Sequence, residues 1–431
     1  MTRTVIIRPD IFCSKNAYRD PERGIQEAVA LAKSIDLLVV DAKIIKIRRL
    51  SPSTLFGTGT IKSLAVNIDN QKIELVFVDG KLSPVQQRKL ETEWKCKVID
   101  RTGIILEIFQ TRANTHEGRL QVELAALDYQ RSRLVRAWTH LERQRGGRGF
   151  LAGPGESQIE ADRRQIDQRR NQIRATLNKV VKTRQVQRIP REKIPLPLVA
   201  LVGYTNAGKS TLFNRLSRSN TYTANQLFAT LDPKMCKIVL PSGSPVILSD
   251  TVGFIGDIPT ELIAAFRATL EELCHASIFL HVRDFSDPDN LNQKRDVQKT
   301  LKELGIEDGD NNLKMIEVLN KIDLLIDNTS ISELYAKKKK KNVVSISSKT
   351  GLGCDELLRS IDAILMKQRQ IFEIKIPMSD GSALAWLYRN GVVLSRIEGK
   401  TDLLLKVSME PGKKAKFQSS FGPLSAKPSL F

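Results

Sequence analysis

The stretch "LVALVGYTNAGKSTLFNRLS", residues 198–217, decides the fold of the central part of the chain. Within it, "GYTNAGKS" (203–210) fits the spacing G-x-x-x-x-G-K-[ST] and lies between an apolar strand pattern and a helix pattern. A loop of this kind turns backbone N–H groups and a helix N-terminus toward phosphates. We therefore predict a phosphate-binding loop in which Lys209 reaches the β- and γ-phosphates and Ser210 binds Mg²⁺.

Two motifs farther along the chain indicate which base is bound. "DTVG" (250–253) and "NKID" (320–323) each end an apolar strand pattern, and ligands of open α/β sheets bind at the carboxyl ends of strands. The Asp323 carboxylate can accept two hydrogen bonds from the N1–H and the exocyclic amine of guanine, which adenine does not offer in that arrangement. "SSK" (347–349) follows the next strand pattern and would close the base pocket. The order of these motifs predicts a guanine-nucleotide site.

The predicted catalytic residues are Lys209, Thr230 and Gly253. Thr230, in "LFATLDP", is expected to bind Mg²⁺ together with Ser210, Asp250 to hold a metal-bound water, and the Gly253 N–H to contact the γ-phosphate. The next residue is Phe254, where Ras-type sites carry the glutamine that orients the attacking water, so we expect slow hydrolysis by the free protein. The full set of predicted contacts with the GTP or GDP cofactor is Gly203, Tyr204, Thr205, Asn206, Ala207, Gly208, Lys209, Ser210, Thr211, Phe228, Thr230, Asp250, Gly253, Asn320, Lys321, Asp323, Ser347, Ser348 and Lys349.

Alternating short apolar stretches and amphipathic stretches predict an α/β chain in four parts. Residues 1–115 are expected to form a small α/β subdomain, and residues 116–193 a long helical hairpin with a Gly-rich basic tip. Residues 194–368 are expected to form a P-loop GTPase domain, a mostly parallel sheet with flanking helices. Residues 369–431 are expected to form a small β-rich C-terminal domain that ends in a Lys/Ser/Pro-rich tail.

Charge and cysteine usage narrow the class of partner and the compartment. The chain has 68 Lys+Arg against 48 Asp+Glu, a formal net charge of +20, which favours a polyanion such as nucleic acid or an anionic membrane. The 5 cysteines form no C-x-x-C pair, so neither a disulfide framework nor a zinc site is indicated. No apolar run reaches about 18 residues, so we expect no membrane span and a cytoplasmic protein.

The stretch "ERQRGGRGFLAGPGESQIEADRR" (142–164) separates two long helix patterns. Its glycines leave little side-chain bulk, so the backbone could approach RNA closely, and its arginines could meet phosphates or stack on bases. The candidate RNA contacts are Arg143, Arg145, Arg148, Gly149 and Gly153. The simpler alternative is a flexible turn between two solvated helices.

Several stretches resemble the HflX family of bacterial GTPases: "GPGESQIEADRR", "FATLDP", "LSDTVGFI", "FRATLEE" and "RTGIILEIFQTRANTHEGRLQVELAALDY". The resemblance implies a GTPase that associates with the large (50S) ribosomal subunit and its rRNA and splits or rescues stalled ribosomes under stress. It also implies that the hairpin tip enters the peptidyl-transferase region. We expect the protein to act as a monomer.

An RNA-binding or helicase-like protein, with an ATP-linked N-terminal activity regulated by the G domain, is the alternative function. The family has been credited with such an activity, and "LFGTGTIKSL" resembles its Gly-x-Gly-Lys stretch. Thr60 occupies the lysine position, however, so a Gly-rich turn at Gly57 and Gly59 is the favoured interpretation. Peripheral membrane signalling is disfavoured because no amphipathic helix with a basic rim and aromatic anchors is found.

Overall fold

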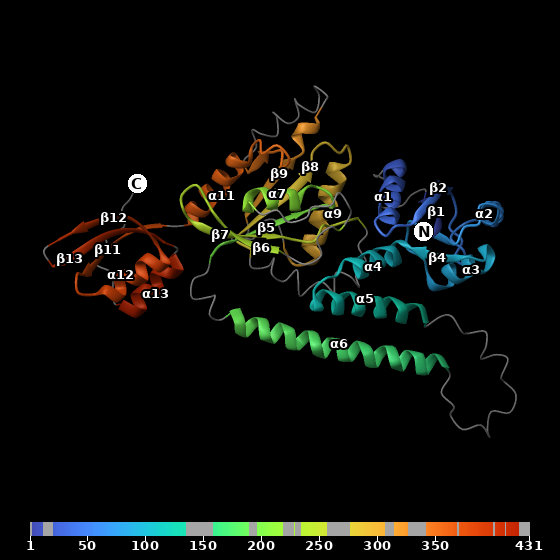
Figure 1. Ribbon diagram of the computed structural model, residues 1–431, viewed down its shortest axis with the longest axis horizontal. Coiled ribbons are helices and arrows are strands. Elements are labelled where there is room, and N and C mark those ends of the chain that lie inside the picture. The colour runs from blue at the N-terminus through green and yellow to red at the C-terminus, as the bar shows by residue number, and fades with distance from the viewer. Residues whose placement is uncertain are drawn as a thin grey trace, which may run out of the picture.

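Three separate β-sheets lie in a row along the longest axis of the computed structural model, with the N-terminal sheet at one end and the C-terminal sheet at the other (Figure 1). The structure describes residues 2–11, 20–134, 158–188, 196–218, 228, 234–256, 276–306, 314–325, 342–368, 370–399, 401–409 and 411–421. No helix within these residues is long and apolar enough to cross a membrane.

The N-terminal sheet has four parallel strands in the order β2-β1-β3-β4. Its elements are β1 (Arg3–Ile11), α1 (Pro21–Lys33), β2 (Leu38–Ile47), α2 (Thr58–Asn70), β3 (Leu75–Val78), α3 (Pro84–Trp94) and β4 (Lys97–Asp100). Helix α3 begins directly after Ser83, because Ser83 and Gln86 form a capping box. The predicted Gly-rich turn is wrong for Gly59, which lies in the first turn of α2, while Gly57 is the N-cap residue of that helix.

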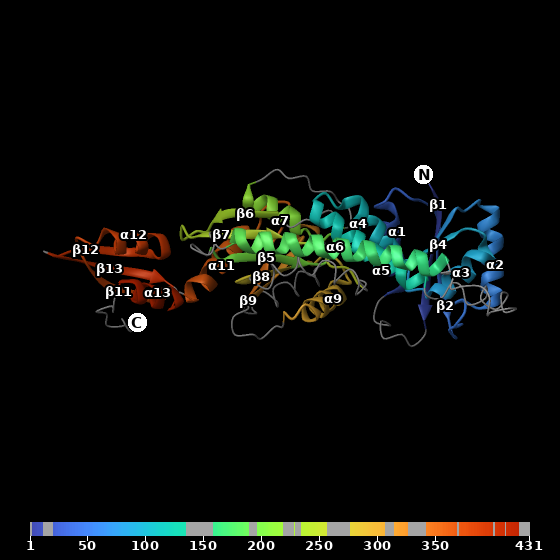
Figure 2. The same ribbon diagram turned by 90° about the horizontal axis from the view of Figure 1, so that it is seen from below.

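Three helices follow: α4 (Arg101–Arg112), α5 (His116–Leu134) and α6 (Gln158–Arg188). Helices α5 and α6 lie side by side in both views (Figures 1 and 2). Arg169 pairs with Glu123 at 2.7 Å and Arg131 pairs with Asp167 at 2.8 Å, so the two helices run antiparallel, as a hairpin requires. The residues that would join them, 135–157, lie outside the described part of the chain.

The central sheet has six strands in the order β10-β9-β8-β5-β7-β6, and every neighbouring pair is parallel except β6 and β7. Apolar residues of α7 and α11 pack on one face of the sheet. Those of α9 pack on the other face, in the same cluster as residues of α4. The elements are β5 (Leu198–Gly203), α7 (Lys209–Ser217), β6 (Lys234–Val239), β7 (Pro245–Asp250), β8 (Ile278–Asp284), α9 (Asn290–Glu303), β9 (Lys314–Asn320), the 3-10 helix η4 (Ile322–Leu324), β10 (Val343–Ser345) and α11 (Cys354–Gln368).

The C-terminal sheet is antiparallel, in the order β11-β13-β12. Its elements are β11 (Gln370–Pro377), α12 (Gly381–Asn390), β12 (Val392–Glu398), β13 (Asp402–Met409) and α13 (Pro411–Phe421). The start of the predicted Lys/Ser/Pro-rich tail is in fact helix α13. Its Phe417 and Phe421 lie one turn apart and both pack on Trp386, with ring centroids 5.3 and 6.3 Å away, which explains the helix.

Candidate nucleotide-binding site

The predicted phosphate loop connects β5 to α7. Its lysine, Lys209, is buried and donates hydrogen bonds from Nζ to the carbonyl oxygens of Gly203 (3.1 Å) and Tyr204 (2.8 Å). Burial lowers the pKa of Lys209 to about 8, against the opposing effect of the nearby Asp250 carboxylate. Gly208 has a φ of 92°, and a Cβ atom there would clash with the side-chain amide of Asn320. The loop therefore needs glycine at this position for both conformation and space.

The predicted metal residues lie next to each other. The Ser210 hydroxyl donates to Oδ2 of Asp250, the last residue of β7, at 2.7 Å. A hydroxyl and a carboxylate are hard oxygen donors of the kind that Mg²⁺ takes, so this pair fits the predicted ion. Thr230, the other predicted ligand, lies outside the described residues.

The backbone after β7 lies directly on the phosphate loop. A Cβ atom at Gly253 would stand 3.0 Å from Thr205 Cα and 3.1 Å from Lys209 Nζ. The Thr205 N–H donates to the Phe254 carbonyl at 2.7 Å, and the Phe254 N–H donates to the Gly203 carbonyl at 3.1 Å. The Phe254 side chain is buried in an apolar cluster. It therefore presents no polar group to the predicted phosphates.

Asn320 connects the phosphate loop to the predicted closing loop. Its side chain is fully buried, its Nδ2 donates to the Ala207 carbonyl at 2.8 Å, and its Oδ1 accepts from the Ser348 N–H at 2.9 Å. Lys321 forms an ion pair with Asp284 at 2.6 Å. Asp323 is exposed in η4, as a side chain that meets a base should be.

The structure thus brings four predicted motifs to one edge of the central sheet, at the carboxyl ends of β5, β7, β9 and β10. Phe228, a predicted nucleotide contact, packs edge-on against Phe109 of α4 with ring centroids 4.7 Å apart. Its contact with the nucleotide stays a prediction. The candidate RNA contacts Arg143, Arg145, Arg148, Gly149 and Gly153 lie outside the described residues.

Sequence reasoning missed one residue that supports the closing loop. The Arg215 guanidinium, on α7, donates to the Ser348 carbonyl at 2.6 Å and also to the Lys349 carbonyl. No motif marks Arg215. Its position six residues after Lys209 on the same helix is the only available signal, and that signal is weak.

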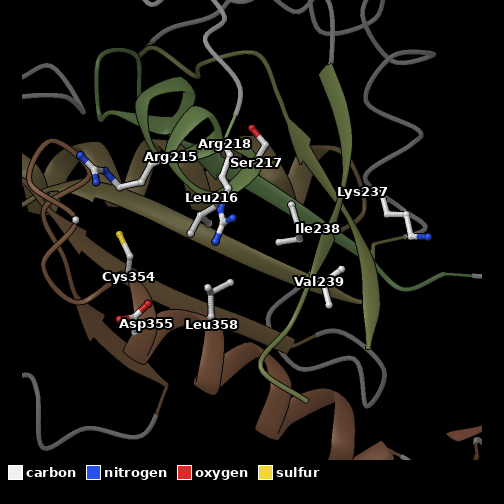
Figure 3. Close-up of a pocket in the computed structure, with 11 residues that line it drawn as sticks. Arg215, Leu216, Ser217, Arg218, Lys237, Ile238, Val239, Cys354, Asp355 and Leu358 are labelled. Carbon is white, nitrogen blue, oxygen red and sulfur yellow. The ribbon is translucent and has the colours of Figure 1, made fainter. Parts of the chain in front are cut away.

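A cavity of about 500 Å³ lies between α7, β6 and α11 (Figure 3). None of the predicted nucleotide contacts lines it, so it is distinct from the candidate nucleotide site. It is lined by Arg215, Leu216, Ser217, Arg218, Lys237, Ile238, Val239, Gly351, Cys354, Asp355 and Leu358.

Comparison with known families covers most of the chain. Residues 22–110 match the GTP-binding GTPase N-terminal family, residues 112–191 the GTP-binding GTPase middle region, residues 198–321 the 50S ribosome-binding GTPase family and residues 333–424 the HflX C-terminal domain.

Individual relatives carry the same description. The chain is 44% identical over 397 residues to GTPase HflX of Magnetococcus marinus, covering 92% of this chain and 90% of that protein. It is 42% identical over 338 residues to GTPase HflX of Escherichia coli, covering 78% of each. A solved GTP-binding protein from Sulfolobus solfataricus in complex with GDP is 21% identical, with a TM-score of 0.42, over 85% of this chain and 99% of that one.

Proposed function

The chain belongs to the HflX family of GTPases, and from that membership we propose that it uses GTP hydrolysis to act on the large ribosomal subunit, splitting or rescuing stalled ribosomes under stress. One observation carries this proposal. The phosphate loop, the Ser210–Asp250 pair that fits Mg²⁺, and the hydrogen bonds of Asn320 between two loops all lie at one edge of the central sheet. The protein acts as a cytoplasmic monomer, with the four parts bounded at residues 115, 193 and 368.

The roles of the site residues follow from their chemistry. Lys209 binds the β- and γ-phosphates, the Gly253 N–H meets the γ-phosphate, and Asp323 selects guanine. Ser210 and Thr230 would hold Mg²⁺, and Asp250 would hold a water bound to it. The ion, when bound, neutralises charge on the β- and γ-phosphate oxygens. Because Phe254 is buried, this chain has no side chain at that position to orient water, so the ribosome completes the catalytic arrangement.

The charge of the helical hairpin supports rRNA as the partner. Residues 131–193 contain 17 Lys+Arg and 6 Asp+Glu, and 17 − 6 gives +11. Among the described side chains of α6, the exposed basic residues include Arg163, Arg164, Arg174 and Lys179. A stiff helix pair that carries such charge suits insertion between RNA strands.

The test is to replace residues 145–155 with a short Ser/Gly linker. Basal GTP hydrolysis should be unchanged, because the phosphate loop and "NKID" lie elsewhere in the sequence. Ribosome dissociation followed by light scattering should be lost, and binding should depend less steeply on salt because fewer phosphates are neutralised. Splitting at the wild-type rate by this variant would refute the role of the tip. Lys209→Ala is the matched comparison and should lose hydrolysis while keeping the fold.

A further inference from the structure

Arg101, the first residue of α4, is buried where the N-terminal sheet meets the central sheet. Within the N-terminal region its guanidinium pairs with Asp79 at 2.6 Å and with Glu27. It also donates from Nε and Nη2 to the carbonyl of Gly256, at 3.3 and 3.1 Å. Burial lowers the pKa of Arg101, but the charges of Asp79 and Glu27 more than offset this and hold the pKa well above its usual value. The arginine is therefore a permanent cation with three acceptors.

Tyr204 of the phosphate loop completes a closed circuit with Arg101. Its hydroxyl donates to Glu27 Oε2 at 2.7 Å and accepts from the Gly256 N–H at 2.9 Å. The circuit thus runs from Arg101 to Glu27, to Tyr204, to the Gly256 N–H, and from the Gly256 carbonyl back to Arg101. We name these four residues the interdomain ring.

The interdomain ring holds both the backbone N–H and the backbone carbonyl of Gly256, beside the phosphate site. The Gly256 carbonyl accepts two hydrogen bonds from Arg101 and its N–H donates one to Tyr204, so the ring holds the Gly256 backbone directly. Three residues earlier, Gly253 lies against Thr205 and Lys209. The segment 253–256 is therefore held at one end by the phosphate loop and at the other by Arg101 of the N-terminal region together with Tyr204.

A backbone N–H that is held in place affects the affinity for the one ligand group with which it bonds. The γ-phosphate belongs to GTP and not to GDP, and a donor held in place before binding stabilises charge without a reorganisation cost. The Gly253 N–H is the group proposed to meet that phosphate. Loosening segment 253–256 would therefore weaken contacts to GTP and leave contacts to GDP intact.

We propose that Glu27 and Arg101 are positioning residues that set the preference of the site for GTP over GDP, by holding segment 253–256 through Tyr204 and Gly256. The inference rests on the proposed placement of the γ-phosphate at Gly253. Neither residue is among the predicted nucleotide contacts, and both act through the interdomain ring. A purely structural role in joining two domains would affect both nucleotides alike.

The experiment compares Glu27→Gln and Arg101→Met with wild type in the full-length chain. Glu27→Gln is close to isosteric and removes the charge that Arg101 and Tyr204 share. Binding of fluorescent GDP should be unchanged within about twofold. A non-hydrolysable GTP analogue should bind about tenfold more weakly, and single-turnover GTP hydrolysis should slow by a similar factor, as expected for a loss of roughly 1.4 kcal/mol.

Arg133→Met is the control. Arg133 pairs with the buried Asp100 at 2.6 Å and donates to Gln87, and both partners belong to the N-terminal region. It should change the thermal unfolding temperature without changing the ratio of GTP-analogue to GDP affinity. Unfolding temperatures of all variants show whether each has folded. If Arg101→Met does not fold, Glu27→Gln still tests the inference.

Three results would overturn the inference. These are an equal loss of GDP and GTP-analogue affinity, unchanged affinities and rates, or faster hydrolysis, which would mean that the ring restrains the segment. Failure of the wild-type chain to bind GDP would instead refute the proposed nucleotide site, and the inference with it.

Discussion

Replacing Asn320 by alanine should separate the phosphate loop from the closing loop. The change deletes two buried hydrogen bonds, to the Ala207 carbonyl and from the Ser348 N–H. Each such bond contributes about 0.5–1.5 kcal/mol net, and a buried polar group left without a partner costs about 1–3 kcal/mol. Ala207 and Ser348 are 1% and 5% exposed, so water compensates little. We expect the free energy of unfolding of this part of the chain to fall by about 2–4 kcal/mol.

The same change should weaken nucleotide binding, because the two loops must then be ordered by the nucleotide itself. If half of the lost energy appears in binding, the dissociation constant for GDP rises by about 5- to 30-fold. Asn320→Asp provides a sharper comparison. It retains the acceptor for the Ser348 N–H but sets a carboxylate against the Ala207 carbonyl, so it should bind GDP no better than Asn320→Ala.

Fluorescent GDP titration and thermal unfolding measure these two effects. Asn390→Ala is the matched control, since its Nδ2 donates to the Trp386 carbonyl at 2.9 Å within helix α12, and it should leave GDP affinity unchanged. Wild-type GDP affinity in both Asn320 variants would show that the hydrogen bonds seen here do not hold the two loops together, and the reasoning would fail.

Two further outcomes are expected from the site. Asp323→Asn should reduce guanine selectivity, because a carboxamide offers one acceptor where guanine presents two donors. Competition between GDP and other purine nucleotides measures this, and an undiminished preference would count against the assignment. GDP affinity should fall as pH rises through about 8, with the loss beginning near pH 7, because phosphate binding needs protonated Lys209, whose pKa burial lowers to about 8. An affinity that stays flat from pH 7 to 9 would contradict this.

The strands and the phosphate motif were predictable because their signals are local. The residues of β5 and of the loop up to Ser210 are consecutive, and both hydrophobic pattern and motif spacing act over fewer than about twenty residues. The same holds for α3, whose first turn is set by Ser83 and Gln86. Helix α13 shows the limit, since its fold depends on packing of Phe417 against the distant Trp386.

The side chains that support the site were not predictable, because their partners lie far away in the sequence. Arg101 contacts Gly256 across 155 residues of sequence, and Tyr204 contacts Glu27 across 177 residues. No periodic pattern spans such separations. The sequence marked Asn320 as part of a base motif, yet its side chain bonds two backbone groups from different loops. Only the folded sheet, which brings strand ends together, shows that arrangement.

The composition of the interdomain ring has a consequence for the order of events during biosynthesis. A growing chain emerges at about 5–20 residues per second, so Gly256 follows Arg101 by roughly 8–30 s. Throughout that delay Arg101 already has Asp79 and Glu27 as counter-ions, both of which emerge before it. The nascent N-terminal sheet therefore need not leave a buried cation unpaired while it waits for Tyr204 and Gly256. Docking of the two domains becomes a late step between two preformed surfaces, insensitive to the speed of translation.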